Sequence, residues 1–183
     1  VLTASVSYFT SDSDLGARLQ ANEDGIFTVM RERTEIDGFE MQASYLLSAQ
    51  TRFSASYADT DGEYDSDGDQ RVDLTLGGRN IAPRRLNVSW HQSWSDMLQT
   101  NVQWSKLFSR DADEPTDIND FDDYYTVNAS ATLDTMNAGS FTLGVENLFD
   151  EFYFTYYAQT VGGDNRNFAG RGRTVTLSWH YGW

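Results

Sequence analysis

The sequence contains no cysteine and no long apolar run, and each absence excludes a class of protein. Without cysteine, thiol catalysis, cysteine-based zinc sites and disulfides are all excluded. No stretch of about 18 consecutive apolar residues occurs, so no transmembrane helix is expected. This does not exclude a membrane protein, because a strand that crosses a bilayer in a barrel needs apolar side chains only at every second position.

Basic residues are also scarce, with 13 Lys and Arg against 28 Asp and Glu and a formal net charge of −15. This balance excludes a nucleic-acid partner, because too few cations are present to neutralise phosphates. The acidic balance by itself indicates only solubility and repulsion. Disorder is the usual alternative for an acidic chain, but an aromatic content of 14% and regular polar–apolar alternation argue against it.

Alternation is clearest at the end of the chain. There Thr176, Ser178, His180 and Gly182 are interleaved with the apolar residues Val175, Leu177, Trp179, Tyr181 and Trp183. Successive side chains of a strand point to opposite faces, so one face of this segment is apolar and the other is small or polar. The chain begins in the same pattern at Val1–Ala4 with no signal peptide, which for an exported protein indicates a mature chain or an excised piece.

Seven earlier segments alternate in the same way, which makes eight expected strands. They are Leu2–Tyr8, Phe39–Leu47, Phe53–Tyr57, Leu86–His91, Leu98–Ser105, Tyr125–Leu133 and Phe141–Glu146.

The connections between these strands alternate in length. Short ones lie near Ser48–Gln50, Ser95–Asp96 and Thr135–Gly139, and long polar ones near Gln20–Asp24, Asp59–Pro83, Asp111–Asp122 and Glu151–Gly170. Short turns on one side and long loops on the other are typical of outer-membrane barrels. The sequence therefore predicts an all-β fold, an antiparallel up-and-down transmembrane β-barrel segment of about eight strands. Its polar faces would line a lumen or pack against an inserted plug.

Several segments resemble the TonB-dependent outer-membrane receptors, in order and spacing, across nearly all 183 residues. Glu146-Asn147-Leu148-Phe149-Asp150 resembles that family's "NLFD-x-x-Y" stretch, and Gly170–Val175 resembles its "GR" entry to the last strand. Asp37–Glu40 resembles a "GxE" point in an earlier strand, and Ser56–Tyr64 resembles the ascending strand that follows. Phe9–Gly16, with Arg31–Arg33 ahead of Gly38, is most similar to the ferric-siderophore receptor branch.

The resemblance implies a 22-stranded barrel with an N-terminal plug. Residues 1–183 would be the C-terminal portion of that barrel, with the plug and the TonB-contacting box absent from this chain. The implied function is uptake of a ferric siderophore or similar iron chelate across the Gram-negative outer membrane, energised through TonB. No resident cofactor and no covalent chemistry are implied. The final strand, from Val175 to Trp183, would be the signal that the outer-membrane barrel assembly machinery reads.

Candidate ligand-binding residues lie in the last long connection: Phe152, Tyr153, Tyr156, Tyr157, Arg166 and Arg171. Aromatic rings at a barrel mouth stack on flat ligand groups, and guanidinium groups attract anionic chelates. The same rings would equally form the aromatic girdle at the membrane interface, which is the favoured interpretation because they follow a membrane strand directly.

The acidic loops and the two histidines predict no metal site and no catalyst. Asp65–Asp69 superficially resembles a calcium loop, but the sixth-position glycine is missing and Leu76 replaces the bidentate glutamate. A weak divalent-ion site shared with lipopolysaccharide phosphates is the alternative to a solvated loop. His91 and His180 both lie on the lumen-side parity, and no nucleophile-elbow sequence accompanies them.

Two other architectures make distinct predictions. A self-contained eight-stranded structural or adhesion barrel requires hydrogen bonds between the Leu2–Tyr8 and Val175–Trp183 segments, whereas a segment of a larger barrel leaves both edges open. A soluble ligand-binding barrel requires Trp90, Trp104, Trp179 and Trp183 to point into a sealed core.

Overall fold

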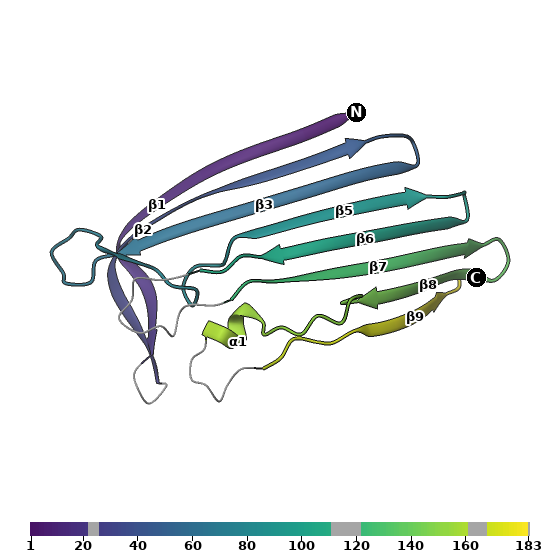
Figure 1. The fold of residues 1–183 in the computed structure, drawn as a ribbon. Helices are drawn as coiled ribbons and strands as arrows, with labels where there is room; N and C mark the ends of the chain where they lie inside the picture. Colours follow the sequence, from purple (N-terminus) through teal and green to yellow (C-terminus); the bar gives the residue numbers. More distant parts are fainter. Residues whose placement is uncertain (22–25, 111–121, 161–167, 183) are drawn as a thin grey trace.

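The computed structural model describes residues 1–21, 26–110, 122–160 and 168–182, which form one antiparallel sheet. Its strand order is β1-β2-β3-β5-β6-β7-β8-β9, and β4 pairs with β3 off this path (Figure 1). The strands are β1 (Leu2–Ala21), β2 (Phe27–Leu46), β3 (Thr51–Tyr64), β4 (Leu74–Thr75), β5 (Arg85–Ser93), β6 (Leu98–Leu107), β7 (Tyr124–Thr135), β8 (Gly139–Glu146) and β9 (Thr174–His180). A five-residue helix, α1 (Tyr156–Thr160), lies between β8 and β9.

The predicted fold class is confirmed, and each of the eight alternating segments coincides with a strand, although Leu47 lies beyond the end of β2 and residues 181–183 lie beyond the end of β9. The boundaries differ in two places. Both β1 and β2 contain 20 residues and extend far beyond Tyr8 and Phe39, where the alternation ends. The extra residues pair with one another, and residues 34–38 of β2 also pair with β3, so only the outermost part is a two-stranded ribbon. The last strand ends at His180, and Trp183 lies outside the described residues.

The register keeps the two faces distinct across the sheet. One continuous row of paired residues is apolar, and the neighbouring row is polar. The apolar row is Tyr45, Phe53, Trp90, Val102, Ala129, Val145 and Val175. The polar row is Thr3, Ser44, Ser54, Ser89, Gln103 and Asn128. A single-residue slip would exchange the faces, so the pattern fixes the register.

The sheet is not closed. In the described residues, β1 pairs along its length only with β2, and β9 only with β8. Figure 1 shows these two strands at opposite edges of the curved sheet. The closed eight-stranded barrel required pairing between them, so the structure does not have that architecture.

The three described tryptophans of this alternative do not point into a sealed core, and the fourth, Trp183, lies outside the described residues. Trp179 is 63% exposed, and Trp90 and Trp104 are half-buried. The structure therefore lacks the buried tryptophan core that the soluble-barrel alternative required of these residues. None of the helices in the described residues is long and apolar enough to cross a membrane.

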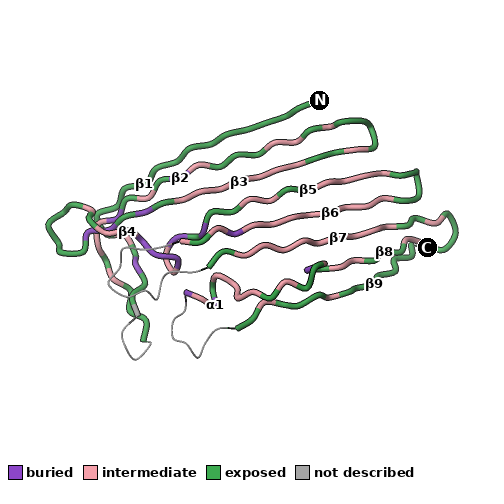
Figure 2. The backbone as a smooth tube through the Cα atoms, viewed as in Figure 1, coloured by how far each residue is buried: buried purple, intermediate pink, exposed green. Residues whose placement is uncertain are grey.

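Burial separates the molecule into two regions (Figure 2). We call the wall the strand segments nearest the short turns, which are residues 2–8, 39–46, 51–57, 86–93, 98–104, 127–135, 139–145 and 175–180. The loop side consists of the described residues of 9–38, 58–85, 105–126 and 146–174. Every described residue that is fully buried lies on the loop side.

The loop side has a small hydrophobic core of its own. Tyr64, Leu76 and Ile81 are at most 5% exposed, and Ile36 and Leu74 pack against them. The chain between β3 and β5 folds back so that these residues cover the outer ends of β2 and β3. This core therefore holds the β3–β5 connection against β2 and β3.

Candidate functional site

The polar face of the wall forms a shallow groove of about 430 Å³ across β1, β2, β3, β5 and β6. Its polar lining is Thr3, Ser5, Gln42, Ser44, Ser54, Ser56, Asn87, Ser89 and Gln103. Some of these groups are paired across strands: Asn87 Nδ2 donates to Ser56 Oγ (3.3 Å), and Asn87 Oδ1 accepts a bond from Ser105 Oγ (2.8 Å). A surface of small, hydrogen-bonded hydroxyls and amides suits water or another polar protein surface. Both predicted uses of this face, as lumen lining and as plug contact, need this chemistry.

The Asn147 side chain of the Glu146–Asp150 motif joins three chain segments just beyond β8. It is 3% exposed, and its Nδ2 donates to the carbonyls of Glu151 (2.9 Å) and Arg171 (3.1 Å). Its Oδ1 accepts the Glu151 amide at 2.9 Å, and its own amide donates to Asn128 Oδ1 at 2.9 Å. The backbone φ of 49° at Asn147 is left-handed, a conformation that asparagine tolerates better than most residues. The motif is therefore a structural corner.

Asp150 and Gly170 complete this corner. Asp150, with φ 57°, accepts the Arg173 amide on Oδ1 at 2.7 Å, which ties the corner to the start of β9. The Gly170 amide donates to the Tyr153 carbonyl at 2.7 Å, while the Tyr153 ring covers the Gly170 Cα. A Cβ at Gly170 would lie 2.2 Å from Tyr153 Cζ, so only glycine fits there.

The predicted ligand-binding aromatics are dispersed over the loop side. Phe152 and Tyr157 are 75% and 69% exposed, and Tyr156 is half-buried at the start of α1. Tyr153 stacks on Tyr124 with the ring centroids 4.5 Å apart. Tyr153 is thus used for internal packing, Tyr156 is half-buried, and Phe152 and Tyr157 are exposed.

A cleft of about 300 Å³ lies beside Phe152 and Tyr153. Its other lining residues are Lys106, Asp122, Asp123, Tyr124, Tyr125, Glu151, Phe154 and Gln159. Lys106 forms an ion pair with Asp123 and lies opposite Tyr125 in the β6–β7 register, on the apolar parity of the wall. This position favours a role in the aromatic girdle for Phe152 and the other rings that line this cleft.

The two predicted arginines have different outcomes. The Arg171 side chain is exposed, while its carbonyl is held by Asn147. Arg166 lies outside the described residues. The neighbouring Arg173 reaches Asp150, with its NH2 nitrogen 4.0 Å from Asp150 Oδ2, so part of the cationic character of this segment is neutralised internally.

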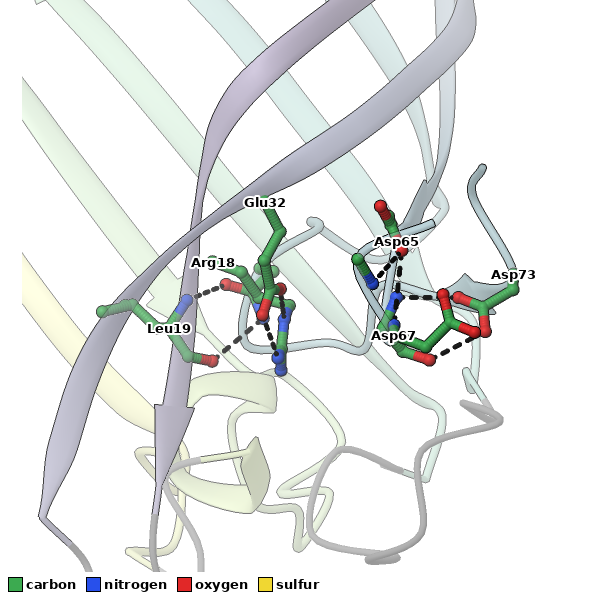
Figure 3. Close-up of polar contacts among 9 residues, drawn as sticks. Arg18, Leu19, Glu32, Asp65, Asp67 and Asp73 are labelled. Atoms are coloured by element: carbon green, nitrogen blue, oxygen red, sulfur yellow. Dashed lines mark hydrogen bonds and ion pairs between the residues drawn. The ribbon is translucent and has the colours of Figure 1, made fainter. Parts of the chain in front are cut away.

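Polar contacts that the sequence did not reveal connect distant loop-side segments. Arg18 forms an ion pair with Glu32 at 2.8 Å (Figure 3). The guanidinium carbon of Arg18 also lies 4.0 Å from the centroid of the Tyr64 ring. The Leu19 amide donates to Asn80 Oδ1 at 2.8 Å, and Asn80 Nδ2 donates back to the Leu19 carbonyl at 3.2 Å. No local pattern marks these contacts, since Leu19 and Asn80 are 61 positions apart.

Asp65, Asp67 and Asp69 place carboxylate oxygens within 4.8 Å of one another in the loop after β3 (Figure 3). Burial by itself would raise the pKa of Asp65, but backbone amides from Gln70, Gly68 and neighbouring residues stabilise the carboxylate and lower the pKa below its usual 3.8. Both Asp65 oxygens accept such amides, Oδ1 from Gly68 at 2.7 Å and Oδ2 from Gln70 at 2.8 Å. These hydrogen bonds show that Asp65 stabilises the conformation of this loop.

An antiparallel, chain-ordered sheet with one apolar and one polar face defines a section of an up-and-down transmembrane β-barrel. The family model described as "TonB dependent receptor-like, beta-barrel" matches residues 1–148. The chain therefore belongs to the TonB-dependent receptor family, whose members are outer-membrane proteins of Gram-negative bacteria.

Solved structures of similar fold include transport receptors for different cargoes. The copper transporter OprC superposes with a TM-score of 0.78 at 18% identity, over 95% of this chain and 27% of OprC. The ferric-catecholate import receptor Fiu from E. coli K12 has a TM-score of 0.67 at 17% identity, over 96% of this chain and 24% of Fiu. The siderophore receptor PiuA from Acinetobacter baumannii has a TM-score of 0.63 at 16% identity, over 96% of this chain and 25% of PiuA. The chain thus spans about a quarter of the length of these structures.

Proposed function

We propose that this chain supplies wall and extracellular loops to an outer-membrane receptor that takes up a ferric siderophore or similar iron chelate, energised through TonB. The family match over residues 1–148 carries this proposal. The two faces of the sheet support it: the apolar face suits lipid, and the polar groove suits a water-filled or plugged lumen. Siderophore receptors among the similar folds favour an iron chelate as the cargo.

We further propose that residues 1–183 are the C-terminal portion of the barrel and that the plug belongs to a part of the receptor not present here. The open outer edges of β1 and β9 support this assignment, because an unpaired strand edge is a ready template for another strand. In the complete receptor, other strands of the same barrel would pair with both edges.

For the ligand, we assign the exposed members of the predicted set to the extracellular mouth. Tyr157 and Arg171 are exposed, and Tyr156 lies next to Tyr157 on α1. Phe152 and Tyr153 contribute to the cleft beside Lys106, where the girdle role competes with ligand contact. Arg166 remains in the predicted set as a residue near the same mouth.

Uptake of radiolabelled iron by cells that carry the full-length receptor tests the proposal. The expected result is receptor-dependent accumulation of iron from at least one chelate, which is lost when TonB is removed. A matched strain without the receptor gives the background. Copper accumulation without chelated-iron accumulation would refute the iron assignment, and accumulation that persists without TonB would refute the energy coupling.

We also propose that Val175, Leu177, Trp179, Tyr181 and Trp183 form the signal for outer-membrane assembly. Val175, Leu177 and Trp179 point outward on β9, at 63%, 72% and 63% exposure, which leaves them accessible to another protein during insertion. Deletion of Trp183 from the full-length receptor should lower its yield in the outer membrane. An unchanged yield with lost uptake would contradict this role.

A further inference from the structure

The outer parts of β1 and β2 form an arm that bends away from the wall. We define the arm as the described segments Gly16–Ala21 and Phe27–Glu32. The β1–β2 register shifts between Ser13 and Gly16, and bulges of this kind bend a strand pair. A Cβ at Gly16 would lie 2.0 Å from Thr34 Oγ1, so the bend depends on glycine. In Figure 1 the arm turns out of the plane of the sheet toward the end that carries α1.

The first of two adjacent contacts joins the arm to the chain between β4 and β5. Asn80 offers its side-chain amide to the free edge of β1, where Leu19 supplies both the donor and the acceptor. The two bonds, 2.8 and 3.2 Å long, reproduce the pattern that a neighbouring strand would make with Leu19. Asn80 thereby holds one strand of the arm.

The second contact joins the same chain segment to α1. The Arg79 guanidinium donates to the Thr160 carbonyl through Nε (3.1 Å) and NH2 (2.8 Å). The same guanidinium lies 5.1 Å from the centroid of the Phe27 ring, on the second strand of the arm. Thr160 is only 1% exposed, so this carbonyl accepts the guanidinium bonds in a water-poor environment.

We propose that Arg79 and Asn80 form a clasp that couples the arm to α1, so that the two elements change position as one unit. Asn80 contacts Leu19, 61 positions away, and Arg79 contacts Thr160, 81 positions away. Because Arg79 and Asn80 are adjacent, movement of either the arm or α1 would strain both contacts. Each neutral Asn80 bond changes an open–closed equilibrium by roughly threefold to tenfold, and the charge-assisted Arg79 bonds contribute more.

The consequence for transport rests on the proposed function. Tyr156 and Tyr157 of α1 belong to the predicted ligand-binding set, so a ligand that contacts α1 would act on the arm through Arg79. The coupling itself needs no ligand. It can be measured on the resting receptor, and its failure is distinguishable from failure to transport iron.

Distances between spin labels test the clasp in the full-length receptor in lipid nanodiscs. Cysteines replace Thr28 on the arm and Tyr157 on α1, both exposed; residues 1–183 contain no other cysteine, and any in the rest of the receptor are replaced by serine. The unaltered clasp should give one narrow distance distribution. The combined change Arg79→Ala and Asn80→Ala should broaden it, whereas Arg71→Ala, at an exposed arginine in the acidic loop, should not. An unchanged distribution in the combined variant overturns the proposal.

Amide exchange separates coupling from local loosening. Asn80→Ala removes contacts to the arm alone, so the Leu19 amide should exchange roughly threefold to tenfold faster. Coupling requires that amides of Tyr156–Thr160 also exchange at least about threefold faster in this variant, although Asn80 does not bond to them. Acceleration confined to the arm overturns the coupling. Asn80→Asp, which keeps the acceptor for the Leu19 amide and loses the donor, should give a smaller change and guards against misfolding of the alanine variant.

Discussion

In the wall, the side chains of Leu177 and Trp179 are 72% and 63% exposed, while on the loop side Tyr64 and Leu76 are each 3% exposed. The wall has a regular ladder of backbone hydrogen bonds and no fully buried residue among those described. The loop side has a hydrophobic core, an ion pair between the buried Arg18 and the half-buried Glu32, and a buried asparagine at the corner. The two regions share one sheet, but the wall is suited to lipid and the loop side is suited to water.

The difference follows from what surrounds each region. In hydrocarbon, the backbone groups must all be paired, but apolar side chains gain nothing by hiding from lipid. In water, the outer ends of β2 and β3 need a cover, which Leu76 and Ile81 supply. The loop side is therefore organised as a small water-soluble protein on top of a membrane wall, and substitutions should affect the two regions through different forces.

The largest expected effect comes from a charge on the lipid face of the wall. Leu177→Arg places a guanidinium in the bilayer, which should destabilise the full-length receptor by about 2 to 4 kcal/mol if the residue lies near the midplane. Urea titration of the folded receptor in liposomes measures this change. Thr176→Arg, on the polar face of the same strand, is the matched control. Equal effects of the two variants would contradict the assignment of faces.

A cavity in the loop-side core should have a smaller and local effect. Leu76→Ala removes a side chain that is 3% exposed and should destabilise the β3–β5 connection by about 2 to 3 kcal/mol. Amide exchange should accelerate around Ile81 and leave the β7–β8 ladder unchanged. Leu15→Ala, at a loop-side leucine that is 69% exposed, serves as the control and should change little. Acceleration that spreads through the wall would show that the two regions are not separate.

The asparagine corner lies where the two regions meet. Asn147→Ala removes three side-chain hydrogen bonds and leaves the Glu151 amide and the Arg171 carbonyl without this partner. We expect a loss of about 1 to 3 kcal/mol, with faster amide exchange at Glu151 and at the start of β9. Asn137→Ala, in the exposed short turn between β7 and β8, is the matched control. Normal protection at Glu151 in the Asn147 variant would contradict the structural role of the corner.

Acid should produce the smallest and most local change. The pKa of Asp65 in the folded loop is below its unfolded value of 3.8, so its ionised form stabilises the loop at all higher pH values. This contribution should be lost as the pH falls below about 3.8 and through the folded pKa. Amide exchange of Gly68 and Gln70, corrected for intrinsic rates, measures the loss. Asp65→Asn should remove the pH dependence, and its persistence in that variant would assign the effect to another carboxyl.

The wall could be predicted almost completely from the sequence, because a face in lipid and a face in water impose strict alternation. Val175, Leu177 and Trp179 are a clear example. The outer parts of β1 and β2 could not be predicted, since residues such as Asp12, Ser13 and Asp14 do not alternate with apolar residues. The family motif could be recognised from its amino-acid sequence. The left-handed backbone at Asn147 and the three hydrogen bonds of its side chain depend on tertiary structure.

The site was only partly predictable for the same reason. The aromatics after β8 were visible in the sequence, whereas the stacking of Tyr153 on Tyr124 depends on how the connection folds back. Arg79 and Thr160 are 81 positions apart, and a five-residue helix gives no detectable periodicity. Contacts of this kind are set by the path of the loops, and no local pattern encodes them.

The order of the long strands in the sheet is also their order along the chain. Within the sheet, each hairpin therefore pairs only with its two neighbours, although the β3–β5 connection also contacts β1 through Asn80 and α1 through Arg79. Insertion or loss of one hairpin would change the circumference of the barrel by two strands and leave every other register intact. A wall built in this way can be resized by duplication without any new threading of the chain.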